Sequence, residues 1–371
     1  MHKKNIIPIF NTYIAPEASN YVGDVLSSGF LSEGALVKEF EKKLADDLGF
    51  TNPVAVNSGT SALHLALVLA GVGPGDEVIC PAQTFVATAL VALQEKAIPV
   101  FADIQYETGN IDPRSIEQKI TSKTKAIIVV HWGGYPCDMK EIHAIAKKHD
   151  IPVIEDAAHA PGATYHGSPI GTLSDFTCFS FQAIKHITTG DGGAVCAKDH
   201  TAAKEAFARR WFGIDRERAE PSPLGERIYD IKNVGYKYHL NDYSAALGIA
   251  NLATFKERLA RRRKIASKYK GGLRNVPGIV LFEENTDRES AYWLFGFHVE
   301  RRNDFIGMMK NEGIATSVIH LGIDHNSVFG GTQEGLVNQR KFNETQIHIP
   351  MHDALSDDQV EHIINTIQKG W

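Results

Sequence analysis

A lysine that follows an apolar run is the side chain whose position points most directly to chemistry. In segment 179–194 the apolar residues up to Phe181 predict a buried strand, and Lys185 follows them just before a turn rich in glycine. Burial and a nearby cationic ring would lower the pKa of this amine and favour a Schiff base with a carbonyl carbon. Ser180 could reach a phosphate from the same segment. Alternatively, Lys185 is an ordinary solvated lysine.

Two carboxylates, Glu155 and Asp156, close a second apolar run. A carboxylate at a strand end can hold a proton on a heterocyclic nitrogen, which keeps a pyridine ring cationic so that it draws electrons from a bound carbon. His159, one turn later, could bond an oxygen on that ring. Asp156 could instead cap a following helix, and a single histidine is more often structural.

A polar turn around Gly59 lies between a short apolar run and a predicted helix. Free N–H groups at a helix N-terminus and the helix macrodipole attract a phosphate, and the hydroxyls of Thr60 and Ser61 would add donors. The same residue types also cap helices that bind nothing, so the turn alone leaves both readings open.

The elements that must position these groups alternate along the first part of the chain. Short apolar runs separated by segments of helical spacing predict a mostly parallel sheet with helices on both faces. Ligands of such sheets bind beyond the carboxyl ends of the strands, where all three features fall. The predicted strands are 53–56, 77–80, 98–101, 126–130, 152–155 and 176–179, and the predicted helices are 60–71, 114–120 and 138–149.

The second part of the chain predicts a smaller α+β domain. Segment 243–275 lacks proline and favours one helix that crosses from the large domain to the small one. Strands at 278–282 and 292–299 and helices at 303–312 and 356–368 follow it, and segment 213–230 favours an exposed loop. We therefore expect a large domain over residues 1–245 and a small C-terminal domain over residues 246–371.

A phosphate cradle, a pyridinium partner and a Schiff-base lysine, in that order on an α/β sheet, together describe a pyridoxal 5'-phosphate site. Through these motifs the chain resembles the DegT/DnrJ/EryC1/StrS family of pyridoxal-phosphate-dependent sugar-nucleotide aminotransferases. The resemblance implies the aspartate-aminotransferase fold (PLP fold type I), with a large mostly parallel sheet domain and a smaller α+β C-terminal domain. It rests on segments 28–34, 39–41, 57–63, 75–78, 84–88, 155–159 and 179–193.

The resemblance also implies roles for the three groups that would act on the cofactor ring. Lys185 would form the internal aldimine and then shuttle a proton between the substrate carbon and the cofactor carbon. Asp156 would pair with the pyridine nitrogen. Phe85 would stack on the ring, and His159 would lie near the ring hydroxyl, where many relatives carry glutamine.

Further residues would hold the cofactor phosphate. The resemblance implies that Gly59, Thr60, Ser61 and Ser180 bind it within one subunit. It also implies a homodimer with shared active sites, in which Lys237 reaches the phosphate of the partner subunit.

Some members of the family carry histidine in place of the lysine and are dehydratases that remove a hydroxyl, so the register of Lys185 and His186 matters. Lys185 lies five positions after Ser180, which is the aminotransferase spacing, and His186 takes the next position. On the sugar side, relatives usually carry His-Tyr-x-Pro-Leu-His. The corresponding stretch, 318–325, lacks the proline and has shifted histidines. His320 and His325 are candidate substrate residues, and exposed histidines without a role are the alternative.

These residues predict an aminotransferase that takes the amino group of L-glutamate and passes it to carbon 3 or 4 of a nucleotide-linked keto-deoxy sugar. The product would be an amino sugar nucleotide for a surface polysaccharide or related glycan. A pyridoxal-phosphate-dependent sugar dehydratase or a carbocycle-forming relative stays open. A non-enzymatic regulator on the same fold is disfavoured, because it would need neither Lys185 nor Asp156.

Composition excludes several other classes. The formal net charge is −5, with 22% charged and 43% hydrophobic residues, so the chain has no electrostatic reason to bind nucleic acid or anionic lipid. No apolar stretch is long enough to span a membrane, and the N-terminal residues lack the apolar core of a signal peptide. We therefore expect a cytoplasmic protein. Its four cysteines form no CxxC pair, which suggests neither a disulfide nor a metal site.

Overall fold

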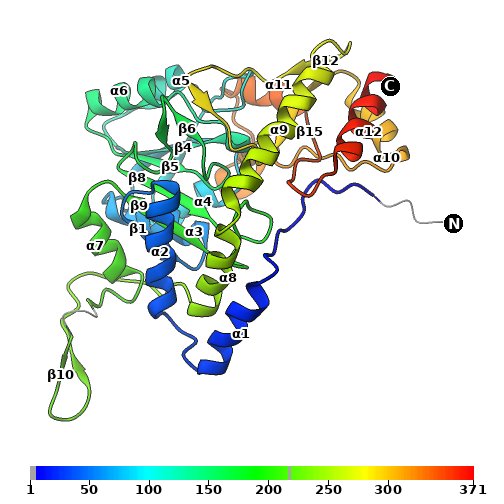
Figure 1. The fold of residues 1–371 in the computed structure, drawn as a ribbon. Helices are drawn as coiled ribbons and strands as arrows, with labels where there is room; N and C mark the ends of the chain where they lie inside the picture. Colours follow the sequence, from blue (N-terminus) through cyan, green and yellow to red (C-terminus); the bar gives the residue numbers. More distant parts are fainter. Residues whose placement is uncertain (1–5, 216–218) are drawn as a thin grey trace.

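The six apolar runs predicted as strands all lie in one sheet of the computed structural model (Figure 1). They form β1 (Pro53–Val56), β2 (Glu77–Pro81), β3 (Ile98–Ala102), β4 (Thr124–Val130), β5 (Val153–Asp156) and β8 (Phe176–Ser180). A seventh strand, β9 (Gly193–Ala197), is inserted antiparallel between β1 and β8, in the order β1-β9-β8-β5-β4-β2-β3. The other neighbouring pairs are parallel, so the prediction of a mostly parallel sheet is confirmed.

The structure describes residues 6–215 and 219–371. The prediction about targeting rests partly on residues 1–5, and the predicted loop at 213–230 includes residues 216–218. Both of these segments lie outside the described residues.

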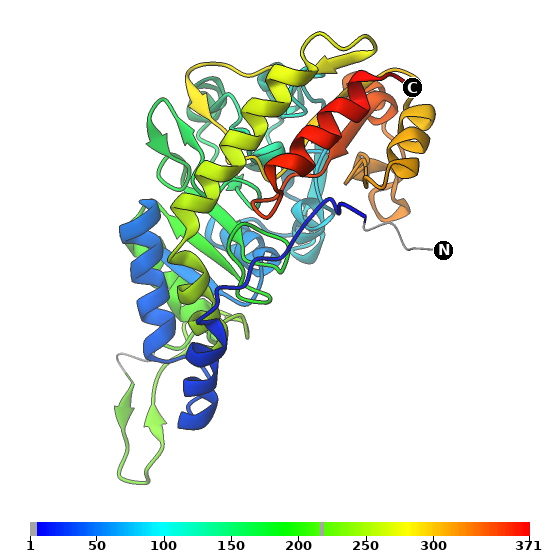
Figure 2. The same cartoon turned by 45° about the vertical axis from the view of Figure 1, so that its right-hand side comes forward.

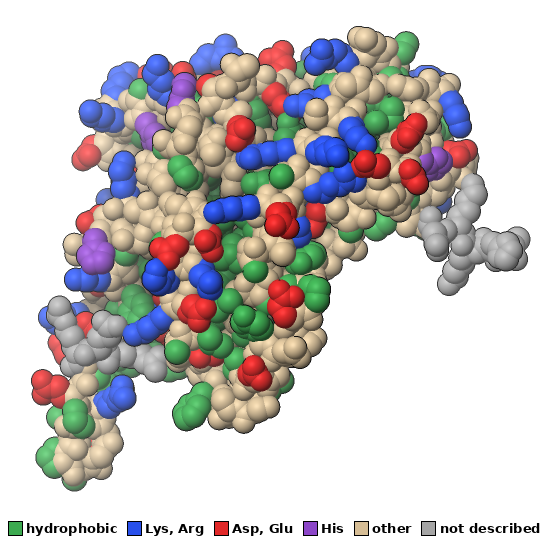
Figure 3. All heavy atoms as spheres, viewed as in Figure 1, with side chains coloured by type: hydrophobic (Ala, Val, Ile, Leu, Met, Phe, Trp, Pro, Cys, Tyr) green, Lys and Arg blue, Asp and Glu red, His purple; other side chains and the backbone are tan. Residues whose placement is uncertain are grey.

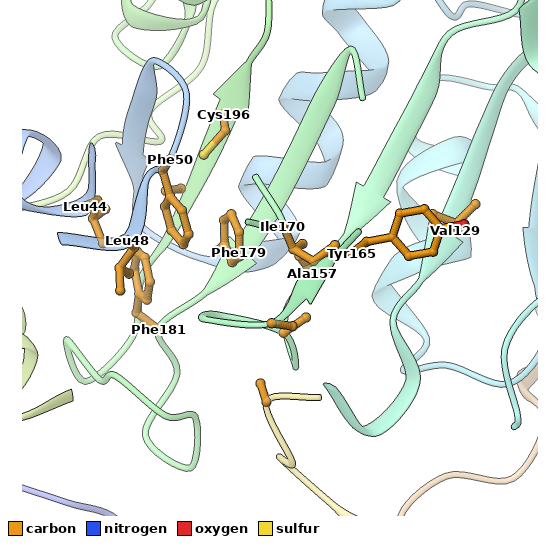
Figure 4. Packing of buried hydrophobic residues seen from close by; sticks show 14 of the residues in the cluster. Leu44, Leu48, Phe50, Val129, Ala157, Tyr165, Ile170, Phe179, Phe181 and Cys196 are labelled. Atoms are coloured by element: carbon orange, nitrogen blue, oxygen red, sulfur yellow. The ribbon is translucent and has the colours of Figure 1, made fainter. Parts of the chain in front are cut away.

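Helices cover both faces of the sheet because successive strand residues point to opposite sides. On one side, residues such as Ala55 and Ile127 pack against α2 (Ala35–Leu48), α5 (Pro113–Lys119), α6 (Met139–His149) and α8 (Asp242–Leu252). On the other side, their neighbours Val54 and Ile128 pack against α3 (Gly59–Leu69), α4 (Ala87–Gln94) and α7 (His200–Arg209). Figure 4 shows part of the first cluster, in which the rings of Phe50 and Phe179 stack with centroids 3.9 Å apart.

A smaller sheet organises the C-terminal part of the chain. It has the order β12-β14-β15, formed by Ile279–Leu281, Phe295–Val299 and Gln346–Ile349. Around it lie α9 (Phe255–Leu273), α10 (Arg302–Asn311), α11 (Val337–Thr345) and α12 (Asp357–Gln368). The helix predicted over 243–275 is two helices, α8 and α9, so that prediction was wrong in its continuity. The boundary at residue 245 stays a prediction.

The N-terminal segment runs along the molecule to this C-terminal part, as Figures 1 and 2 show. Ile7 bridges to Ile314 and packs in the C-terminal core, whereas α1 (Ala18–Ser28) packs against α8. The remaining strands are short: β6 (Thr164–Tyr165), β7 (Ser168–Pro169) and β13 (Arg288–Glu289) form one sheet, and β10 (Glu220–Pro221) and β11 (Arg227–Ile228) form a protruding hairpin. Short 3-10 turns lie at Trp132–Gly134, Ile323–His325 and Ser327–Phe329.

Positively and negatively charged side chains are intermixed on the face that Figure 3 shows. Within residues 6–215 and 219–371, no helix has the length and apolar character that a membrane span requires. The same described residues contain no cluster of three or more His, Cys, Asp or Glu side chains that could hold a metal ion.

Candidate active site

A cavity of about 490 Å³ lies at the carboxyl ends of β5 and β8, beside the N-terminus of α3. Its floor comes from strand-end residues of the large sheet, and its opposite wall comes from Trp293, Ser317, Ile319 and His320 of the C-terminal part. Phe10 of the N-terminal segment also lines it. The cavity therefore lies where the sequence predicts the chemistry.

Asp156 ends β5 inside this cavity and is 6% exposed. One carboxylate oxygen accepts a hydrogen bond from Thr88 Oγ1 at 2.7 Å, and the other accepts one from the N–H of Ala158 at 3.2 Å. Burial raises the pKa of Asp156, while these hydrogen bonds and the nearby Lys185 oppose that rise. The residues after Asp156 form turns, so the alternative that it caps a helix is wrong.

Lys185 lines the same cavity, and its Nζ lies 3.6 Å from the centroid of the Trp293 ring. Burial lowers the pKa of this amine to about 7, and the charge of Asp156 works against that shift. A surface lysine would stay charged at neutral pH, whereas burial favours the neutral form of this one. The structure therefore contradicts the solvated alternative.

His186, the next residue, does not line the cavity. Its ring is buried, and Nε2 lies 2.8 Å from the carbonyl oxygen of Ala291. Burial lowers the pKa of His186 well below its ordinary value. Only the lysine of this pair is presented to the cavity.

The N-terminus of α3 brings Gly59 and Thr60 to the cavity, opposite Ser180 at the end of β8. A Cβ on Gly59 would lie 2.9 Å from Cβ of Ser180, so glycine permits this close approach. The side chain of Ser58 caps the helix by accepting a hydrogen bond from the N–H of Ser61 at 3.0 Å. The turn therefore caps the helix, and its residues Gly59 and Thr60 also line the cavity. The hydroxyl of Ser61 donates to Asn57 Oδ1 at 2.6 Å, and Ser61 does not line the cavity.

His159 and Phe85 lie at other parts of the wall. The imidazole of His159 stacks on Trp293 with centroids 3.8 Å apart and an angle of 14°. Its Nδ1 is buried without a hydrogen-bond partner, and burial lowers the pKa of His159 well below its ordinary value. Phe85 is 55% exposed and lies 5.4 Å from the ring of His320.

The structure separates the two candidate substrate histidines. His320 lines the cavity, and burial lowers its pKa to about 4. His325 is exposed and outside the cavity, with Nδ1 turned back to the carbonyl oxygen of Gly322 at 2.5 Å. Lys237 also lies outside the cavity, with Nζ 3.8 Å from the centroid of Trp211.

Sequence reasoning missed two residues that line the cavity, Trp293 and Thr88. Thr88 belongs to the segment 84–88, but only the start of α4 at Ala87 turns its hydroxyl toward Asp156. Trp293 was read as part of a strand over 292–299, whereas the strand begins at Phe295. An aromatic residue just before a strand is too common a pattern to signal a cavity wall.

Comparisons with known proteins agree with this geometry. The model of the DegT/DnrJ/EryC1/StrS aminotransferase family matches residues 12–368. The spore coat polysaccharide biosynthesis protein SpsC of Bacillus subtilis is 35% identical, with 99% of this chain and 97% of that protein covered. GDP-perosamine synthase of Escherichia coli O157:H7 is 31% identical, with 98% of each chain covered.

Solved structures are similar over the same length. The sugar aminotransferase CalS13 from Micromonospora echinospora has a TM-score of 0.94 and 35% identity, with 99% of this chain and 100% of that chain covered. The PLP form of Spr1654 from Streptococcus pneumoniae has a TM-score of 0.90 and 32% identity, with 98% of each chain covered. These similarities confirm the predicted fold and identify pyridoxal phosphate as the cofactor.

The cavity fits this cofactor on its own evidence. The cradle of Gly59, Thr60 and Ser180 at a helix N-terminus suits a phosphate, and the buried carboxylate of Asp156 suits a protonated ring nitrogen. The unpaired Nδ1 of His159 can accept a hydrogen bond from a ring hydroxyl. The amine of Lys185 lies in the same cavity.

Proposed function

Because the chain belongs to the DegT/DnrJ/EryC1/StrS aminotransferase family and is a pyridoxal-phosphate-dependent sugar aminotransferase, we propose that it transfers the amino group of L-glutamate to a nucleotide-linked keto-deoxy sugar. Carbon 3 or 4 of the sugar receives the amine. The product is an amino sugar nucleotide for a surface polysaccharide or related glycan. The names of SpsC and GDP-perosamine synthase support this sugar chemistry.

The observation that carries the proposal is the position of Lys185. It lines the cavity that Asp156 also lines, while His186 is turned away to Ala291. A dehydratase of this family would need a histidine where the lysine lies. The geometry therefore favours amino transfer over removal of a hydroxyl.

When bound, the cofactor supplies a carbonyl carbon that accepts an amine and a cationic ring that withdraws electrons from it. Asp156 maintains that positive charge by holding the proton on the ring nitrogen, and Thr88 holds the carboxylate in place. Gly59, Thr60 and Ser180 would hold the phosphate, and the exposed ring of Phe85 would stack on the cofactor ring. Ser61, whose hydroxyl is bonded to Asn57, would support the phosphate site through the helix cap.

Lys185 moves the proton. Because burial lowers its pKa to about 7, this amine would take a proton from the substrate carbon and, once charged, would deliver it to the cofactor carbon. His320 contacts the sugar from the opposite wall, and His325 has no direct contact.

We also propose that the active site is completed by a second copy of the chain. Among the described residues, Lys185 is the only Lys or Arg that lines the cavity, yet the cofactor, L-glutamate and a nucleotide sugar are all anionic. Lys237 lies outside the cavity of its own chain, and we assign it to the phosphate of the partner subunit. Exposed apolar side chains on and near α1, including Tyr21, Leu26 and Phe30, suit a dimer interface. The cytoplasmic location stays a prediction.

The test is the visible spectrum of the purified protein with pyridoxal phosphate, before and after addition of L-glutamate. We expect a visible band of the lysine-bound cofactor that glutamate bleaches, with release of one 2-oxoglutarate per site. A band that does not change when L-glutamate is added would favour a dehydratase or another amino donor. If no band forms, the assigned cofactor chemistry of Lys185 is wrong.

A further inference from the structure

Trp293 is buried, and it contacts two side chains of the candidate active site. Its ring is 2% exposed and lies against both the imidazole of His159 and Nζ of Lys185. Its indole N–H donates a hydrogen bond of 3.1 Å to the carbonyl oxygen of Ile184. Ile184 directly precedes Lys185, so one side chain contacts both the amine of the lysine and the backbone that carries it.

The backbone around Trp293 is itself fixed. The N–H groups of Ala291 and Leu294 donate to the carbonyl oxygens of Gly134 and Gly133, which lie next to the end of the large sheet. Tyr292, between them, has a positive φ of 47°, a conformation that a bulky residue keeps only when its surroundings hold it. Trp293 is therefore presented to Lys185 by a rigid segment from the C-terminal part of the chain.

The contact with Lys185 has the geometry of a cation–π interaction. The distance of 3.6 Å from Nζ to the ring centroid is short for such a contact, and indole is the strongest aromatic partner of a cation. Asp156, the carboxylate whose charge acts on Lys185, is engaged by Thr88 and Ala158. The ring face of Trp293 is thus the site at which the free ammonium group rests.

We propose that Trp293 is a positioning residue for Lys185: its ring holds the free amine whenever Lys185 is not bonded to the cofactor, and its indole N–H fixes the turn at Ile184. This inference rests on the proposed function, since an aminotransferase must release and recapture its lysine in every cycle. Trp293 acts through Lys185, and it is distinct from the residues that bind the cofactor.

The test uses the full-length protein without cofactor and measures how fast its lysine captures added pyridoxal phosphate between pH 5.5 and 9, followed by visible absorbance. Capture requires the neutral amine, so its rate rises with pH through the pKa of Lys185, which is about 7. Two variants separate the contacts: Trp293→Phe keeps an aromatic face without the N–H, and Trp293→Leu removes both.

Trp371 provides a matched control. Its indole N–H also donates to a backbone carbonyl, that of Glu300 at 2.8 Å, and the guanidinium of Arg301 lies 6.0 Å from its ring. It lies outside the cavity. Trp371→Leu should leave both the rate and the midpoint of capture unchanged.

We expect Trp293→Phe to keep the midpoint and to slow capture severalfold. Trp293→Leu should lower the midpoint by about one pH unit, because the ammonium form loses its aromatic partner. The proposal is overturned if both variants match the unsubstituted protein, or if the leucine variant raises the midpoint, since the ring would then act only by excluding water. If Lys185→Ala captures the cofactor as the unsubstituted protein does, the proposed function fails instead.

Discussion

The two walls of the cavity are built in different ways. The wall from the large sheet presents Asp156 and Ser180 at the ends of β5 and β8, so regular hydrogen-bonded strands fix their positions. Opposite it, beside Trp293, the loop wall of Ser317, Ile319 and His320 belongs to an irregular segment, in which Ile319 has a positive φ of 55°. Distant residues hold that segment: Ser317 pairs with the backbone of His348, and the carbonyl oxygen of His320 accepts from Gln83 and Gln346.

This difference separates the tasks of the site. Groups that act on the cofactor need the same geometry in every cycle, which strand ends and a helix N-terminus provide. The loop wall can change its side chains without disturbing the sheet, so it is suited to choosing the sugar. We therefore expect changes in the sheet wall to abolish the reaction with every substrate, and changes in the loop wall to affect only the sugar.

The largest effect is expected at Lys185. Lys185→Ala should lower the turnover of L-glutamate by at least about a thousandfold, because the group that moves the proton is lost. Lys185→Arg should do the same while it keeps the charge. The measurement is 2-oxoglutarate release, with an unchanged circular dichroism spectrum as the control for folding. Substantial residual turnover in either variant would contradict the role of this lysine.

Asp156→Asn should have the next largest effect, a loss of roughly a hundredfold or more in turnover. An amide can no longer keep a proton on the ring nitrogen, so the cofactor withdraws electrons less strongly. Thr88→Val removes one hydrogen bond to this carboxylate and should cost about tenfold. Equal losses in both variants would mean that the two residues act only by supporting the fold.

The sheet wall could be predicted from the sequence for a physical reason. Apolar runs of four to seven residues specify strands, and chemistry at Asp156 and Lys185 follows their ends. The predicted strands do not include β9, whose apolar residues directly follow the glycine-rich turn. The contact from Trp293 to Ile184 could not be predicted, since it joins residues 109 positions apart.

Two other differences at the site also arise from the three-dimensional structure, which the sequence pattern does not reveal. Ser61 has the right type for a phosphate contact, but helix geometry places its hydroxyl on Asn57 within the cap. His325 has the right type for a sugar contact, but the short 3-10 turn at Ile323–His325 directs its ring to Gly322. In both cases residue type alone was insufficient, because the local backbone turns the side chain away from the cavity.

Paired histidine variants test the loop wall. His320→Ala should raise the KM for the keto sugar about tenfold, the cost of one lost hydrogen bond to the substrate. His325→Ala should leave it within about twofold, since its ring lies outside the cavity. Both should leave the glutamate half-reaction, measured by bleaching of the visible band, unchanged. A larger effect of the His325 variant would mean that His325, and not His320, contacts the sugar.

Paired serine variants test the phosphate cradle in the same way. Ser180→Ala should weaken cofactor binding severalfold in a fluorescence titration, because one donor to the phosphate is lost. Ser61→Ala removes a hydroxyl that supports the helix cap and should lower the free energy of unfolding by about 1 kcal/mol with little change in cofactor affinity. The same loss of affinity in both variants would mean that Ser61 binds the cofactor phosphate directly.

The smallest effect is expected at Ile319, where strain and packing oppose each other. Glycine adopts a positive φ without cost, so Ile319→Gly recovers about 1 kcal/mol of backbone strain while it loses the packing of a partly buried side chain. Its free energy of unfolding should therefore stay within about 1 kcal/mol of the unsubstituted protein. The neighbouring Val318→Gly relieves no strain and should be the more destabilised variant in urea.

Because Ile319 lines the cavity, its glycine variant should still raise the KM for the keto sugar while glutamate bleaching proceeds normally. If Ile319→Gly instead slows the glutamate half-reaction, the loop wall takes part in the common chemistry, and the division of tasks between the two walls is wrong.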